Sequence, residues 1–198
     1  KTGGKAKGFI LNSKNANTCN ADGEEKAYKM CEMTAEKMGV KPEEILIAQT
    51  GVIGQILPLE PIEAKIDELY EGLSYEGNEK AAIAIMTTDT VKKEVAVEFE
   101  LDGKICHVGG MGKGSGITTD CAVSSEMLKK ALTDIVKITY NCLSVDGDQS
   151  TNDTCAVMAN GLAGNAEITA EGESYEVFKK ALYIVMLNIT KMLAKDGE

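Results

Sequence analysis

Two short stretches that follow apolar runs carry groups suited to binding or acyl chemistry. Residues 12–17 (NSKNAN) contain three asparagine amides, and residues 50–54 (TGVIG) contain two glycines close together. A glycine at the end of a strand can turn backbone N–H groups toward a ligand, which is the arrangement that an oxyanion hole requires. Taken alone, each stretch is also explained as an ordinary turn rich in asparagine or glycine.

A third stretch, residues 109–116, is dense in glycine and holds one cation, Lys113. It does not match the Walker A phosphate loop, because Gly114 stands between Lys113 and Ser115, whereas that motif places Ser or Thr directly after Lys. The sequence therefore predicts a flexible loop. Its lysine either holds a carboxylate or lies in solvent, as most lysines do.

A fourth stretch, residues 146–154, is rich in Asp, Asn, Ser and Thr. An EF-hand calcium loop is excluded, because its glycine and final glutamate positions, counted from Asp146, hold Thr151 and Val157. Asp146 and Asp148 also suit a magnesium-dependent phosphatase, in which one carboxylate attacks phosphorus and the next handles the proton. That function is kept as an alternative.

The elements that position these stretches alternate between strands and helices, which predicts a mixed α/β fold. Strands are expected at residues 7–12, 45–48, 95–101 and 104–108, and Asp102-Gly103 is a hairpin signal between the last two. Helices are expected at residues 22–38, 61–73, 81–85, 124–138 and around 178–192.

Local signals fix several of these boundaries. Asp22 and Glu25 predict a capping box at the start of the first helix, and Gly39 predicts its end. No repeat, low-complexity linker or break in composition interrupts the sequence, so residues 1–198 are expected to form a single α/β unit.

Composition excludes several classes of partner. The net charge of −10 argues against nucleic acid and against an anionic membrane surface, since both need a basic face. Six cysteines without C-x-x-C spacing and a single histidine, His107, argue against a zinc site. No apolar run is long enough for a transmembrane helix. Because the cysteines show no disulfide pattern, we expect them to be reduced, as in a cytoplasmic protein.

Taken together and in this order, the stretches resemble the bifunctional ornithine acetyltransferase / glutamate N-acetyltransferase family of arginine biosynthesis. The resemblance rests on residues 12–17 (apart from Lys14, where the family pattern has Gly), 50–54, 84–90 (AIMTTDT), 109–116, 146–154 and 196–198. It covers the whole chain and implies that the chain is about half of a usual member, without an N-terminal and a C-terminal portion.

The resemblance implies the layered α-β-β-α fold of that family, with mixed sheets and covering helices. It also implies a precursor that cuts itself before a threonine, whose hydroxyl then carries acetyl from N2-acetyl-L-ornithine to L-glutamate. By this resemblance the Thr50 hydroxyl and the Gly51 N–H form the oxyanion hole. Thr87, Lys113 and Glu198 bind substrate, with Lys113 suited to the α-carboxylate and Glu198 to the ornithine ammonium.

The nucleophilic threonine itself is absent from the sequence. In the family it lies in a stretch that follows the glycine-rich loop, whereas here Gly116 runs directly into Ile117, so that stretch is missing between residues 116 and 117. Thr118 and Thr119 match the family's downstream Thr-Thr-Asp, which we interpret as a polar turn. An inactive ligand-binding relative without the nucleophile is therefore a further alternative.

The resemblance also sets expectations for cofactors and partners. It implies no metal or nucleotide cofactor, although acetyl-coenzyme A serves some members as an acetyl donor. The expected partners are small-molecule substrates, and the resemblance implies a heterotetramer of two α and two β chains after self-cleavage.

Overall fold

The computed structural model describes residues 3–113, 115–144, 147 and 150–196. The chain divides into two compact units: unit 1 is Lys1–Thr87 with Ser150–Asp153, and unit 2 is Thr88–Gln149 with Thr154–Glu198. The sequence predicts one unit. That expectation stays a prediction, because the boundary between the compact units falls inside a continuous polar segment without a glycine or proline linker and four later residues return to unit 1.

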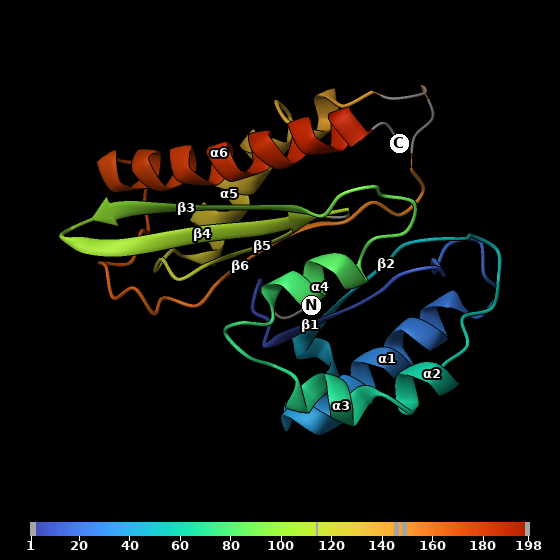
Figure 1. Ribbon diagram of the computed structural model, residues 1–198. Helices are drawn as coiled ribbons and strands as arrows, with labels where there is room; N and C mark the ends of the chain where they lie inside the picture. The colour runs from blue at the N-terminus through green and yellow to red at the C-terminus, as the bar shows by residue number, and fades with distance from the viewer. Residues whose placement is uncertain (1–2, 114, 145–146, 148–149, 197–198) are drawn as a thin grey trace. The chain divides into compact units, whose positions relative to one another are not determined.

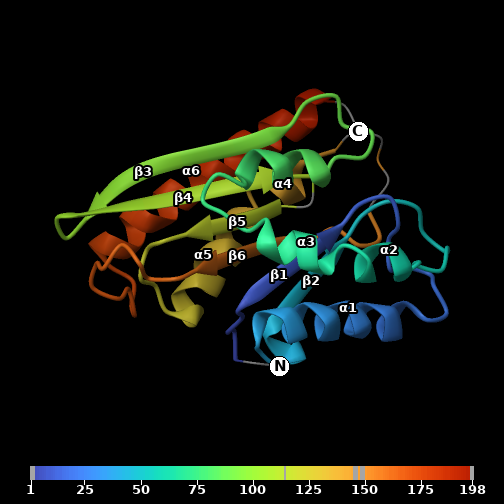
Figure 2. The same cartoon turned by 60° about the horizontal axis from the view of Figure 1, so that its bottom comes forward.

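Unit 1 is built on a pair of parallel strands. β1 (Gly8–Asn12) pairs with β2 (Ile45–Gln49) from Gly8 opposite Ile45 to Asn12 opposite Gln49. Helix α1 (Gly23–Met38) and the short 3-10 turn η1 (Pro42–Glu44) connect the two strands. Figure 2 shows α1 running along the strand pair. Their shared core includes Ile10, Met30, Ala35 and Ile45.

The two ends of α1 differ from each other in how well the sequence predicts them. Gly39 ends the helix in the left-handed conformation at φ 65°, as predicted. The capping box is wrong, because the Asp22 side chain makes no capping hydrogen bond.

Three short helices complete unit 1. They are α2 (Glu60–Glu63), α3 (Ile66–Glu71) and α4 (Asn78–Ala84). The single helix expected over residues 61–73 is therefore interrupted between α2 and α3. Its apolar spacing does not mark one buried face, since Leu69 is 56% exposed and Leu73 69% exposed.

Unit 2 is built on a mixed four-stranded sheet in the order β3-β4-β5-β6. The strands are β3 (Lys93–Leu101), β4 (Lys104–Gly112), β5 (Ser115–Thr119) and β6 (Cys155–Ala159). β3, β4 and β5 are successively antiparallel, and β6 lies parallel to β5. The Asp102-Gly103 hairpin is confirmed, with both residues at positive φ.

Helices α5 (Ser125–Val136) and α6 (Glu173–Asp196) belong to unit 2, together with the 3-10 turn η2 (Tyr140–Cys142). Figure 1 shows α6 lying along β3 and β4, with α5 beside it. Ser124 caps α5 by accepting a hydrogen bond from the Met127 N–H. The core between helices and sheet includes Val108, Phe178 and Leu182.

The glycine-rich stretch is mostly strand and not the flexible loop that the sequence predicts. β4 extends through Gly112, and β5 begins at Ser115. A Cβ on Gly110 would lie 2.9 Å from side-chain atoms of Val185 and Ile189, so this glycine allows α6 to approach the sheet closely. Thr118 and Thr119 lie at the end of β5, so the polar-turn interpretation is also wrong.

The mixed α/β class, with mixed sheets and covering helices, is confirmed. Within the described part of the chain, no helix combines the length and apolar character that crossing a membrane requires.

Candidate functional site

The two turns that follow β1 and β2 lie against each other in unit 1. The Thr50 N–H donates to the Asn12 carbonyl at 3.1 Å, and the Val52 N–H donates to the Lys14 carbonyl at 3.0 Å. The Ala16 N–H donates back to the Val52 carbonyl at 2.9 Å. The structure therefore joins residues 12–17 and 50–54, which the sequence presents as separate stretches, into one backbone clamp.

Gly51 is at the centre of this clamp. Its φ of 130° is a conformation that side chains rarely adopt, and a Cβ there would lie 2.1 Å from the Lys14 carbonyl carbon. Glycine is required at this position for both reasons. The clamp thus fixes the direction of the peptide between Thr50 and Gly51.

The Gly51 N–H of this peptide and the side-chain hydroxyl of Thr50 are two neighbouring hydrogen-bond donors. Within residues 3–113, 115–144, 147 and 150–196, neither the Thr50 hydroxyl nor the Gly51 N–H donates a hydrogen bond. Thr50 is half-buried, and Gly51 is exposed. Two adjacent donors without internal acceptors, on a fixed backbone, have the chemistry that stabilising an oxyanion requires.

Asn152 supports the same strand end from the fourth polar stretch. Its side-chain amide donates to the Gln49 carbonyl at 2.5 Å, directly before Thr50. The Gln49 side chain is buried, and its amide contacts the Met30 sulfur at 2.9 Å. The sequence did not predict this role for Asn152, because its pairing with a distant strand end gives no signal along the chain.

Lys113 lies at the turn between β4 and β5 in unit 2. Its ammonium donates to the Thr88 hydroxyl at 3.1 Å and lies 3.4 Å from Asp89 Oδ2. Its side chain is 23% exposed, so it is neither a solvated surface lysine nor fully buried. Thr87, the other expected substrate-binding residue, is exposed and directly precedes Thr88 in the chain.

A buried ionic cluster lies behind Lys113. Lys93, the first residue of β3, contacts Asp89 Oδ1 at 2.6 Å and also binds Asp196 near the end of α6. Burial favours the neutral form of Lys93, but hydrogen bonds to Asp196 and Asp89 outweigh it, and its pKa lies above the ordinary value. Hydrogen bonds from Lys93 and then from Thr90 lower the pKa of Asp196 to about 2.

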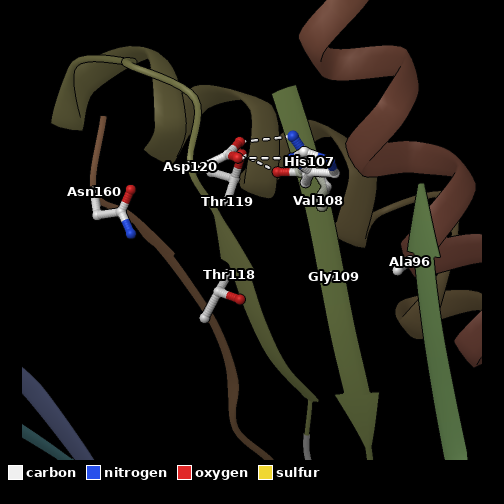
Figure 3. A pocket seen from close by; sticks show the side chains of 8 residues that line it. All are labelled: Ala96, His107, Val108, Gly109, Thr118, Thr119, Asp120 and Asn160. Carbon is white, nitrogen blue, oxygen red and sulfur yellow. Dashed lines mark hydrogen bonds and ion pairs between the residues drawn. The ribbon is translucent and has the colours of Figure 1, made fainter. Parts of the chain in front are cut away.

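A polar hollow that the sequence did not predict lies on unit 2 (Figure 3). It has a volume of about 300 Å³. His107 Nδ1 lies 2.8 Å from Asp120 Oδ2, and this hydrogen bond raises the pKa of His107. Thr118 and Asn160 also line it. The described residues contain no group of three or more His, Cys, Asp or Glu side chains that could hold a metal ion.

The expected site residues fall into three groups. Thr50 and Gly51 lie in unit 1, as does Thr87 at its boundary, whereas Lys113 lies in unit 2. Glu198, like Asp146 and Asp148 of the phosphatase alternative, lies outside the described residues.

The family model of the ArgJ family matches residues 1–198. The chain belongs to the ArgJ family. It is 47% identical over 203 residues to the arginine biosynthesis bifunctional protein ArgJ 1 of Clostridium acetobutylicum, an alignment that covers 96% of the chain and 50% of that relative. It is 44% identical over 211 residues to the glutamate N-acetyltransferase of Methanocaldococcus jannaschii, covering 98% of the chain and 51% of that relative.

The ArgJ-family chain thus spans about half the length of the curated relatives that it matches. Among solved structures it is similar to the arginine biosynthesis bifunctional protein ArgJ of Bacillus halodurans, with 35% identity and a TM-score of 0.49. That match covers 54% of this chain and 56% of the other.

Proposed function

We propose that this chain is part of an acyltransferase of arginine biosynthesis. The enzyme transfers acetyl from N2-acetyl-L-ornithine to L-glutamate through a threonine acyl-enzyme. Family membership supports the reaction class, since relatives carry the names arginine biosynthesis bifunctional protein and glutamate N-acetyltransferase.

The observation that carries the proposal is the pair of donors at Thr50 and Gly51. During acyl transfer the carbonyl oxygen of the acetyl group becomes negatively charged, and fixed donors stabilise it. The clamp with Asn12, Lys14 and Ala16 fixes the backbone that carries these donors. One such donor contributes about 3 kcal/mol to lowering the barrier.

Lys113 is proposed to bind the substrate α-carboxylate, and Thr87 and Glu198 are proposed as further substrate-binding residues, Glu198 for the ornithine ammonium. The partial exposure of Lys113 supports this, because a charged ligand must reach it from solvent. Contacts with Thr88 and Asp89 fix its ammonium, so less side-chain entropy is lost when a ligand binds.

The nucleophile is proposed to belong to a stretch that this sequence lacks between Gly116 and Ile117. The alignment with the M. jannaschii relative spans 211 positions, which exceeds the 198 residues of this chain. At least 13 positions of that alignment are therefore gaps in this chain. An excess of this size supports a missing segment.

Intact mass and denaturing electrophoresis of the purified full-length protein test the processing step. We expect two fragments cut close to the Gly116–Ile117 junction, with threonine at the start of the second fragment. A single uncut chain of full family length would refute self-cleavage. Native mass of the cleaved protein tests the proposed assembly of two α and two β chains.

Acetyl transfer from N2-acetylornithine to glutamate tests the activity directly. We expect turnover without added metal or nucleotide, and the same assay with acetyl-coenzyme A identifies a second donor. A cleaved protein that binds acetylornithine but transfers no acetyl would instead support the inactive ligand-binding relative.

A further inference from the structure

Lys93 is buried far more deeply than lysines usually are. Its side chain is 1% exposed, and a buried ammonium is stable only when anions pair with it. It contacts both Asp89 and Asp196, whose side chains are 4% and 6% exposed. These three groups alone carry a net charge of −1, and Lys113, through Asp89, brings the four to neutrality.

Asp89 connects the two lysines. Its Oδ1 lies 2.6 Å from the Lys93 ammonium, and its Oδ2 lies 3.4 Å from the Lys113 ammonium. Asp196 is itself held by the Thr90 N–H at 3.1 Å and by the Thr90 hydroxyl. The ammonium of Lys113 is therefore tied through Asp89 to a buried cluster that joins the start of β3 to the end of α6.

We propose that Lys93, Asp89 and Asp196 are positioning residues that fix the location of Lys113 and set the local charge for a substrate carboxylate. The inference rests on the proposed function, because that function assigns the carboxylate to Lys113. The three residues act through Lys113 and do not themselves contact the substrate.

Charge balance predicts a different change in ligand binding for each variant, whereas a purely structural role predicts a loss of binding in all of them. Without the Lys93 charge, Lys113 is the remaining cation among these four groups and faces two carboxylates, so a substrate carboxylate is bound more weakly. Without the Asp196 charge, the cluster gains one positive charge, so the substrate carboxylate is bound more tightly than by the parent. Removing both charges restores neutrality.

The test uses Lys93→Met, Asp196→Asn and the double variant in the full-length protein. Lys92→Met is the matched control, since Lys92 is the adjacent lysine, is 41% exposed and pairs with Glu94 at 3.7 Å. Calorimetry gives the dissociation constant for N2-acetylornithine, the transfer assay gives KM and kcat, and circular dichroism confirms folding.

We expect Lys93→Met to weaken acetylornithine binding about tenfold, with kcat of the folded protein changed less than about threefold. Asp196→Asn should bind about tenfold more tightly than the parent, the double variant within about threefold of it, and Lys92→Met like the parent. Parental binding in Lys93→Met, or loss of binding in all three cluster variants, would overturn the inference.

If Lys93→Met does not fold, Asp196→Asn and the double variant still decide the question. We expect Asp196→Asn to bind about tenfold more tightly than the double variant, and equal binding would overturn the charge argument. A parent that binds acetylornithine without transferring acetyl refutes the proposed function alone, and the binding series still tests the cluster. A parent that does not bind acetylornithine overturns both.

Discussion

Replacing Gly51 with alanine gives the sharpest test of the proposed oxyanion hole. A Cβ at residue 51 would lie 2.1 Å from the Lys14 carbonyl carbon, 2.3 Å from its oxygen and 2.6 Å from its Cα. Ordinary contact begins near 3.4 Å, and all three atoms are backbone, so no side-chain rotation relieves the overlap. The peptide that presents the Thr50 and Gly51 donors must therefore move by about 1 Å.

The size of the effect follows from this displacement. Misplacing a catalytic group by about 1 Å costs about a hundredfold, and losing an oxyanion donor costs about a hundredfold to a thousandfold in kcat. We expect Gly51→Ala to lose kcat by that factor, with KM changed only a few-fold. We also expect a stability loss of about 1–3 kcal/mol, because φ is 130° at this position.

Gly54→Ala is the matched control. Gly54 also has positive φ, at 76°, but a Cβ there meets nothing within 4 Å. The control should lose about 1 kcal/mol of stability and retain kcat within about threefold. The acetyl-transfer assay and urea unfolding of the three proteins measure both quantities. Parental kcat in Gly51→Ala, or an equal loss in the control, would refute the assignment.

Three further outcomes are expected. Lys113→Ala should raise KM for acetylornithine tens-fold or more, since a buried charge pair is worth about 2–5 kcal/mol. The control Lys129→Ala should change KM little. Equal kinetics in the two variants would mean that Lys113 does not bind the substrate. Asn152→Ala should lower kcat, because it removes the hydrogen bond to the Gln49 carbonyl that supports the turn at Thr50 and Gly51. Unchanged turnover would mean that Asn152 does not support the oxyanion hole. The pKa of Asp196 is about 2 when folded and about 4 when unfolded. Its stabilising effect is therefore complete above about pH 4 and lost as pH falls toward 2, and urea unfolding over this range should show a weaker pH dependence in Asp196→Asn.

The elements with strong local signals were predictable from the sequence. Alternating residues and Asp102-Gly103 specify the β3–β4 hairpin, and Ser124 specifies the start of α5, because turn and cap geometry depend on neighbouring residues. β5 and β6 were missed. They are short, and their pairing joins residues such as Ile117 and Val157 that lie far apart in sequence.

The candidate site shows the same division. Thr50, Gly51 and Lys113 were predicted as site residues from family motifs, whose residue order is visible in the sequence. The clamp from Lys14, the Asn152 contact and the Lys93 cluster depend on contacts across long stretches of chain, so no local pattern indicated them. The two compact units are defined by contacts and not by composition, so the sequence carried no signal for them.

The distance along the chain between Lys93 and Asp196 also bears on how unit 2 folds. These partners are separated by 103 residues, and α6, the last element of unit 2 along the chain, packs on its first strands, β3 and β4. Contacts of such high sequence separation form slowly, because a large loop must close before they can stabilise anything. During synthesis, the apolar face of the β3–β4 hairpin emerges well before α6 can cover it. Unit 2 therefore passes through a state in which that face is exposed until α6 has been synthesised.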